Sequence, residues 1–343
     1  MKTFLYRFLP WLLAVGLLWW VLRSVELAAV WRVLQQLAFG ELLWLAVANG
    51  VVLLTLNGRW WLTLYGQGHK LPFWRLLGYR LAAFGLSYVT PGPHFGGEPL
   101  QVYFVEKGEG VARETAVAAV TLDKLLELFI NFTFLLLGVI VIIQGRAAPG
   151  LVGQRGLLAA AGLFAAPLGM LIGLWGGKRP LTSLLHGSKG LWQRLGGGET
   201  YSRLLVVVEH SEQQMIQFCR QTPGLLLAAL LLSLVSWLAM LAEYWLMVSF
   251  LGTTLTLLQL VVTLTAARIA ILLLIPGAVG ALEASQLLAF QAVGLDPAVG
   301  ISASLLIRAR DVVLAALGLW WGVRQLRRLS GTAVWHRFRL GRK

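Results

Sequence analysis

The chain has 343 residues, of which 58% are hydrophobic and 13% are charged. Soluble domains carry about 25% charged residues, so this composition excludes an ordinary soluble protein and predicts an all-α integral membrane protein. Twenty-nine Lys and Arg residues outnumber fifteen Asp and Glu residues and give a net charge of +14. Membrane proteins place such cations in cytoplasmic loops, so we expect no nucleic-acid partner. The single cysteine, Cys219, excludes an intramolecular disulfide.

Six apolar runs are long enough to cross a membrane, which takes about 20 residues per helix. The runs are 8–22, 42–64, 111–143, 157–175, 224–251 and 299–323. The first run follows Lys2 and Arg7 and therefore resembles a signal peptide. Charged and bulky residues stand where a cleavage site would need small ones, so we expect a retained first span.

Two further apolar regions are each interrupted by a Pro-Gly pair and followed by a stretch too short to cross. The interruptions are Pro91-Gly92 after residues 76–89 and Pro276-Gly277 after residues 257–275. Irregular backbone is tolerated at membrane depth only where protein buries it or water reaches it. We therefore expect two re-entrant helical hairpins, each of which enters and leaves the membrane by the same face.

The order of span, hairpin and span occurs twice, in residues 42–143 and in residues 224–323. One span lies in the linking segment 144–223, so the second copy has the opposite orientation. This arrangement is an inverted-topology repeat, which is typical of membrane transporters. We expect a single membrane domain over residues 1–343 that ends in a basic tail at 324–343.

Lys and Arg residues concentrate in segments that this topology places on one side of the membrane. The main ones are the loop at 59–80, in which we place Arg59, the connection at 177–223 and the tail at 324–343. Positively charged loops remain in the cytoplasm. The charge distribution therefore predicts that both termini are cytoplasmic.

Both copies carry polar residues at matched positions. A Glu stands seven residues after each Pro, a base stands fourteen residues after a later Gly, and an acid stands seventeen residues after that Gly. The matched pairs are Glu98 and Glu283, Lys124 and Arg308, and Glu127 and Asp311. A helix that restarts after a Pro-Gly break has unpaired backbone N–H groups at its N-terminus, which favour an anion such as phosphate.

Two interpretations of these charged residues remain open. The glutamates either cap their helices or lie on a pathway through the membrane. The cations either pair with neighbouring carboxylates or face a polar cavity that receives an anionic headgroup. The candidate substrate-binding residues are Arg80, Pro91, Gly92, Gly97, Glu98, Lys124, Arg268, Pro276, Gly277, Glu283, Arg308 and Arg310. The candidates for gating or structural ion pairs are Asp123, Glu127 and Asp311.

Motifs of soluble enzymes are absent from the sequence. The five histidines show no zinc spacing, and there is no nucleophile elbow, P-loop or dinucleotide fingerprint. We therefore expect no catalytic residue, no metal and no cofactor.

The order of Arg80, Pro91-Gly92, Gly97-Glu98 and Asp123-Lys124, followed by Pro276-Gly277, Glu283 and Arg308, resembles a known family. It is similar to the flippase-like membrane region of bacterial lysylphosphatidylglycerol synthases, the multiple peptide resistance factors. The resemblance covers nearly the whole chain and implies a multi-pass protein of the bacterial inner membrane that moves a phospholipid between leaflets. In that family a separate soluble domain makes the aminoacylated lipid. The chain ends soon after its last span, so we expect no synthase activity.

These features lead to one preferred function and two alternatives. We expect a flippase that moves an anionic phospholipid or a lipid-linked phosphate intermediate between leaflets. The first alternative is a membrane-embedded enzyme, or an accessory subunit, that acts on a lipid-linked phosphate or sugar. The second is a scaffold that binds an anionic lipid. A homo-oligomer or a lipid-synthesis enzyme is the expected protein partner.

Overall fold

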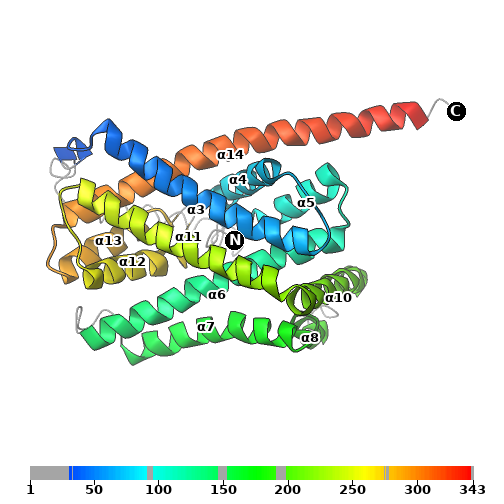
Figure 1. The fold of residues 1–343 in the computed structure, drawn as a ribbon, viewed down its shortest axis with the longest axis horizontal. Coiled ribbons are helices and arrows are strands. Elements are labelled where there is room, and N and C mark those ends of the chain that lie inside the picture. Colours follow the sequence, from blue (N-terminus) through cyan, green and yellow to red (C-terminus); the bar gives the residue numbers. More distant parts are fainter. Residues whose placement is uncertain are drawn as a thin grey trace, which may run out of the picture.

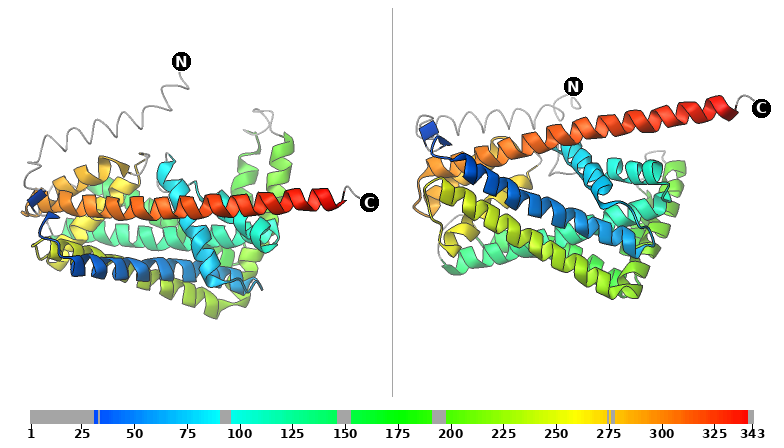
Figure 2. Two further views of the ribbon diagram at one scale, coloured as in Figure 1. Left: turned by 90° about the horizontal axis from the view of Figure 1, so that it is seen from above. Right: turned by 45° about the horizontal axis from the view of Figure 1, so that its top comes forward.

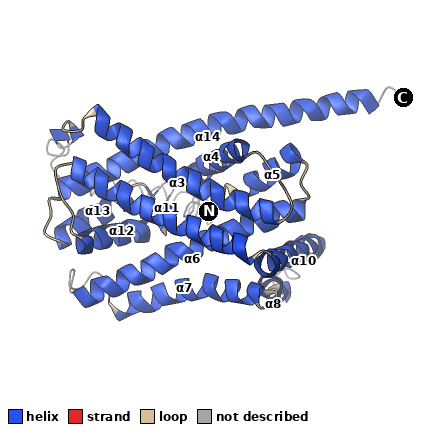
Figure 3. Cartoon of the chain, viewed as in Figure 1, coloured by secondary structure: helices blue, strands red, loops and turns tan. Residues whose placement is uncertain are grey.

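The computed structural model describes residues 31–32, 34–90, 96–145, 153–190, 198–273, 275 and 278–340. This part of the chain consists of helices and turns and contains no strand (Figure 3). The helices are α3 (Phe39–Gly66), α4 (Phe73–Val89), α5 (Glu98–Glu109), α6 (Arg113–Gly145), α7 (Gln154–Trp175), α8 (Pro180–Gly187), α10 (Gly198–Gln221), α11 (Pro223–Phe250), α12 (Leu257–Ile271), α13 (Ala281–Ala292) and α14 (Pro297–Leu340). The predicted all-α membrane fold class is therefore confirmed.

Four of the described helices are long and apolar enough to cross a membrane, namely α3, α6, α7 and α11. They contain four of the six runs predicted as spans. The predicted run at 299–323 lies within α14, which is not among the four and carries Arg308, Arg310 and Asp311 near the middle of that run. The predicted first span at 8–22 lies outside the described residues.

Helix α11 shows how the sequence suits these helices to an apolar solvent. Leu227, Leu231 and Leu238 are more than half exposed and lie on its outer face, whereas Ser233 and Glu243 are buried. A soluble helix has the opposite pattern, with apolar residues inside and polar residues outside. The outer leucines suit contact with hydrocarbon, and the inner polar groups point toward the centre of the bundle.

The helices that surround the two Pro-Gly interruptions are arranged alike. The α4–α5 pair and the α12–α13 pair each consist of two short helices that follow one another in the sequence. Helix α4 packs on α14 and α12 packs on α6, whereas α5 packs on α6 and α13 packs on α14. Helices α3 and α11 lie side by side along most of their length (Figure 1). Each short pair therefore contacts the last long helix of both predicted halves.

Glycine is required directly before α5 and α13. Gly280 adopts a positive φ of 77° directly before α13, a conformation that L side chains rarely adopt. A Cβ atom at Gly97 would lie 2.0 Å from the carbonyl oxygen of Ala83, so α5 begins in direct backbone contact with α4. The Pro91, Gly92, Pro276 and Gly277 positions lie outside the described residues.

Helix α14 extends past the end of the bundle, so its last turns lie beyond the other helices (Figures 1 and 2). At about 1.5 Å per residue its 44 residues span more than twice the thickness of a hydrocarbon core. Arg324, Arg327 and Arg328 of α14 are exposed, although Leu329 still packs on the bundle. Helices α8 and α10 lie at this same end of the bundle (Figure 1).

Small residues bring α4 and α14 into backbone contact. A Cβ atom at Gly318 would lie 1.9 Å from the carbonyl oxygen of Leu81, and one at Gly85 would lie 2.6 Å from that of Ala315. Such close approach of helices is how small residues stabilise packing in a membrane, where dispersion contacts replace the hydrophobic effect. This contact fixes the first short helix pair against the last helix of the chain.

The Gly318→Ala substitution tests this contact. The added methyl group forces the two helices apart, and we expect a net loss of about 1–3 kcal/mol of stability, as for overpacked sites. Gly169→Ala in α7 is the matched control, because no atom lies within 4 Å of its Cβ position. The control gains helix propensity of about 1 kcal/mol. Unfolding in mixed micelles measures both, and equal stability of the two variants would contradict the close contact.

Candidate functional site

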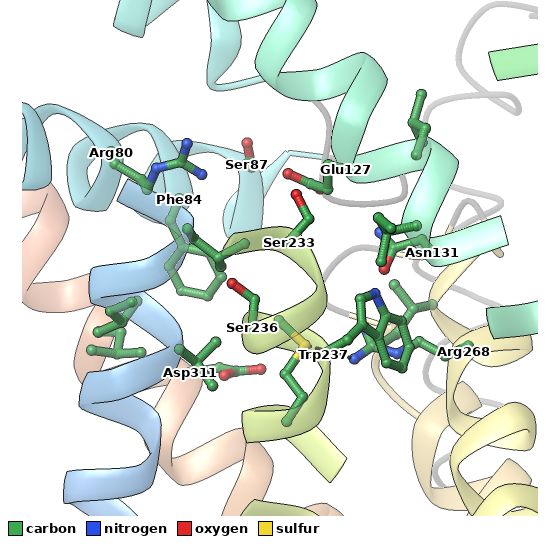
Figure 4. A pocket seen from close by; sticks show the side chains of 18 of the residues that line it. Arg80, Phe84, Ser87, Glu127, Asn131, Ser233, Ser236, Trp237, Arg268 and Asp311 are labelled. Carbon is green, nitrogen blue, oxygen red and sulfur yellow. Dashed lines mark hydrogen bonds between the residues drawn. The ribbon is translucent and has the colours of Figure 1, made fainter. Parts of the chain in front are cut away.

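A cavity of about 370 Å³ lies at the centre of the bundle. Its lining residues come from α3, α4, α5, α6, α11, α12, α13 and α14, so both predicted halves contribute to it. Figure 4 shows polar and charged side chains that project into this space from several helices. A polar cavity inside an apolar bundle is expensive unless its charged groups are paired or it has a function.

The cavity is lined by equal numbers of positively and negatively charged side chains. The cations are Arg59, Arg80, Lys124, Arg268 and Arg310, and the carboxylates are Glu98, Asp123, Glu127, Glu243 and Asp311. The cavity lining therefore has a formal charge of 5 − 5 = 0. Most of these groups are held in ion pairs that join different helices.

Asp123 is the centre of the largest group of ion pairs. It lies on α6 and accepts hydrogen bonds from Arg59 Nε of α3 at 2.6 Å and from Arg80 Nη2 of α4 at 2.5 Å. Arg59 also donates to Glu127 at 3.2 Å and to Ser233 Oγ of α11 at 3.3 Å. Only 2% of the Arg59 side chain and 6% of the Asp123 side chain are exposed. One carboxylate therefore connects three helices through two guanidinium groups.

Arg59 was predicted to lie in a loop at 59–80, and this prediction is wrong. Helix α3 continues to Gly66, so Arg59 lies inside the helix two turns before its end. The sequence gave one indication, since Arg59 falls within the apolar run 42–64, where a cation is costly. Its partners Asp123 and Glu127 are 64 and 68 residues away, which explains why no local pattern revealed them.

Each of the two matched glutamates pairs with the matched cation of its own predicted half. Lys124 Nζ lies 3.3 Å from Glu98 Oε1, and Arg308 donates two hydrogen bonds to Glu283, at 2.6 and 2.9 Å. The second pair is the more buried one, because 2% of the Glu283 side chain is exposed and 26% of that of Glu98. Lys124 also contacts Glu127 at 3.0 Å.

The glutamates also bind the irregular backbone that precedes their helices. Both lie in the first turn, as predicted, and Glu98 accepts the N–H of Gly96 at 2.8 Å while Glu283 accepts that of Gly280 at 2.9 Å. The N–H of Gly97 is taken by Ser87 Oγ at 2.8 Å. Capping and pairing with a cation therefore occur together at both sites.

Arg310 of α14 pairs with two carboxylates. It lies 2.7 Å from Glu243 of α11 and 2.8 Å from the adjacent Asp311. Glu243 and Arg310 are 67 residues apart in the sequence, so no local pattern connected them. The ion pair joins α11 to α14 on the wall of the cavity.

Arg268 of α12 lies against an aromatic ring. Its guanidinium carbon lies 4.6 Å from the ring centre of Trp237, and Nη2 donates to the sulfur of Met240 at 3.1 Å. Within the part of the chain that the structure describes, no carboxylate forms an ion pair with Arg268. Figure 4 shows Arg268 beside Trp237, with Asn131 on the same side of the cavity.

The structure thus brings together most of the predicted site residues, but not all of them. Arg80, Gly97, Glu98, Lys124, Arg268 and Arg310 line the cavity, together with the predicted ion-pair residues Asp123, Glu127 and Asp311. Glu283 and Arg308 form a separate buried pair that is not part of its lining. The Pro-Gly positions of both breaks lie outside the described residues.

The acidic side chains of the cavity are paired with cations. Among the described residues, no three His, Cys, Asp or Glu side chains group in a way that could hold a metal ion. The described carboxylates of the cavity each contact at least one cation. Breaking a buried ion pair is costly, so a charged ligand must replace the contacts that it displaces.

The Asp123→Asn substitution tests the central group of ion pairs. The change leaves Arg80 without its carboxylate and weakens the pairing of Arg59, so we expect a loss of about 3–5 kcal/mol of stability, as for broken buried ion pairs. Glu199→Gln is the control, because Glu199 pairs with Arg203 on an exposed surface of α10 and should change stability little. Unfolding in mixed micelles measures both, and equal behaviour of the two variants would contradict the network.

Comparison with known proteins agrees with the family that the motifs indicated. A model of the lysylphosphatidylglycerol synthase TM region matches residues 7–332. A UPF0104 membrane protein of Methanothermobacter thermautotrophicus is 23% identical over 283 residues, which cover 80% of this chain and 82% of the relative. A UPF0104 membrane protein of Pyrococcus horikoshii is 23% identical over 325 residues, which cover 90% and 92% of the two chains. The chain is therefore a membrane protein that belongs to the family of lysylphosphatidylglycerol synthase transmembrane regions.

Proposed function

We propose that this protein moves a phosphate-bearing lipid between the two leaflets of a membrane. The headgroup passes through the central cavity while the acyl chains remain in hydrocarbon. The observation that carries the proposal is a cavity lined by ten charged side chains (5 + 5) inside a bundle whose outer faces are apolar. Ionisable groups at membrane depth are costly and usually belong to a substrate pathway. The substrate is an anionic phospholipid or a lipid-linked phosphate intermediate.

The pairing of helices supports an inverted repeat as the basis of this movement. In the proposed repeat α3 corresponds to α11, α4 to α12, α5 to α13 and α6 to α14. The contact of α4 with α14 then has a counterpart in that of α12 with α6, and α3 contacts its own counterpart α11. Such an exchange of partners is expected if a two-fold axis passes between α3 and α11. The two short helix pairs would then act as re-entrant hairpins on opposite faces.

The ion pairs suggest how the cavity opens to one side at a time. Lys124 and Arg308 each connect a short helix pair to the long helix that follows it, through Glu98 and Glu283. A headgroup that passes one of these pairs on its way into or out of the cavity competes transiently with the carboxylate and so weakens the connection on that side. Alternating access follows if only one of the two connections is broken at a time.

A proteoliposome assay tests the proposed function. We expect protein-containing vesicles to transfer a fluorescent phospholipid between leaflets faster than empty vesicles. Glu98→Gln should change this rate by about tenfold, because it removes a charge-assisted hydrogen bond, while Glu199→Gln on the exposed surface of α10 should leave it unchanged. Equal rates for full and empty vesicles would contradict lipid movement. Release of a chemically altered product from a labelled lipid phosphate would instead support a membrane-embedded enzyme.

We further propose that the protein lies in the cytoplasmic membrane with both termini inside the cell, because the basic segments of the sequence then share one side. Cysteine labelling tests this orientation, since the native Cys219 is 1% exposed and its burial raises the pKa of its thiol to about 11. Below that pH the thiolate is scarce, so at pH 8 the native residue should react slowly.

Exposed Gln154 at the start of α7 and exposed Lys189 in the connection before α10 are suitable labelling sites. In intact cells an impermeant maleimide should label Gln154→Cys, whereas Lys189→Cys should react only after permeabilisation. The reverse result would place the termini outside. The unsubstituted protein is the control for reaction at Cys219.

A further inference from the structure

Arg268 differs from every other cation that lines the cavity. The four others each lie within ion-pair distance of one or more carboxylates. Among the described residues, Arg268 has only the sulfur of Met240 as a hydrogen-bond acceptor. A thioether is a weak acceptor. Most of the N–H groups of this guanidinium therefore remain available to a ligand.

Aromatic packing holds the guanidinium of Arg268 in place. Trp237 lies beside it at 4.6 Å, and Phe134 of α6 stacks on Trp237 with a centre-to-centre distance of 4.2 Å and an interplanar angle of 22°. A cation against an aromatic ring is stabilised by the ring electrons, which offsets part of the cost of having no carboxylate. Figure 4 shows Arg268 and Trp237 beside each other, and both line the cavity.

The charges of the cavity limit what this site can accept. The four paired cations and five carboxylates have a formal sum of 4 − 5 = −1, and Arg268 restores neutrality. A ligand at Arg268 thus meets one positive charge within a lining that is otherwise slightly negative. A single negative charge is matched there, whereas each additional one is repelled.

We infer that Arg268, supported by Trp237, is the receptor for one phosphodiester group of a membrane lipid. A phosphodiester has one negative charge and two non-bridging oxygens, which suit the paired N–H groups of a guanidinium. Asn131 lies on the same side of the cavity and supplies a further amide donor (Figure 4). The inference rests on the proposed function, because it names the headgroup chemistry of the same cavity. Phosphomonoesters and pyrophosphates carry more charge than the site can neutralise.

Lys124 and Arg308, which lie well inside the predicted runs 111–143 and 299–323, are less suited to this role. Each contacts a glutamate that also caps a short helix. Arg310 is held between Glu243 and Asp311. A headgroup would have to displace a carboxylate from any of these cations, but not from Arg268.

Binding of short-chain lipids to the purified protein in detergent tests the inference at pH 7.5. Calorimetry should show that phosphatidylglycerol, a diester, binds about tenfold more tightly than phosphatidic acid, a monoester of the same chain length. Arg268→Gln should weaken phosphatidylglycerol binding by about 10- to 100-fold, as expected for the loss of charge-assisted hydrogen bonds. Arg268→Lys should recover only part of this affinity, because it keeps the charge but not the planar fork. Arg203→Gln, an exposed site on α10, should bind like the unsubstituted protein.

Several results would overturn the inference. They are equal affinity for the two lipids, unchanged binding by Arg268→Gln, and full recovery by Arg268→Lys. A fatty acid that competes as well as phosphatidylglycerol would show that the site selects a single negative charge and not a phosphodiester. If Arg268→Gln does not fold, the phosphatidylglycerol affinity of Arg268→Lys relative to the unsubstituted protein decides whether the inference holds. Lipid binding that depends on Arg268 without transfer in vesicles would reject the proposed function alone, and transfer that Arg268→Gln leaves intact would reject this inference alone.

Discussion

The structure depends on the neutralisation of charges that the surrounding helices cannot expose to water. An isolated charge at membrane depth costs several kcal/mol, so each must find a partner on another helix. Asp123 illustrates the consequence, since its two oxygens bind Arg59 of α3 and Arg80 of α4. These contacts fix the relative depth of three helices more strictly than apolar packing does, because leucine side chains in lipid have little preference for one neighbour over another. The same groups make the centre of the bundle polar enough to accept a headgroup.

Features that arise from local sequence could be predicted. The positions of Glu98 and Glu283 follow from the distance to the preceding Pro-Gly, because a broken helix that restarts brings the next acid into its first turn. Helix existence and type likewise follow from apolar run length. The position of Arg59 could not be read in this way. Its partners lie on α6, and only the packing of α3 against that helix turns a cation near the end of an apolar run into a buried one.

The choice of the ligand-binding cation is a still less local problem. Sequence position alone favours Lys124 and Arg308, which lie well inside the long predicted runs 111–143 and 299–323, over Arg268, which lies in the shorter, interrupted run 257–275. Depth, however, determines only how costly a charge is. Which cation stays available to a ligand depends on which cations the carboxylates already bind. Arg310, for example, is bound by Glu243, which is 67 residues away in the sequence. Arg268 differs from the other cations of the cavity because its neighbours Trp237 and Met240 carry no negative charge.

The two glutamate–cation pairs differ in chemistry although their residues occupy matched positions in the sequence. Arg308 presents a planar fork to Glu283 and forms two short hydrogen bonds in a buried setting. Lys124 presents a point charge that it shares between Glu98 and Glu127, and Glu98 is partly exposed. When a guanidinium group separates from a carboxylate, it loses both hydrogen bonds together. An ammonium group, in contrast, can move from one carboxylate to another by a small rotation of its side chain. The backbone of the two halves can thus be related by symmetry although the energies that hold their short helices are not. In the proposed transport cycle such inequality would favour one resting side, because a strictly symmetric pair of connections would favour neither.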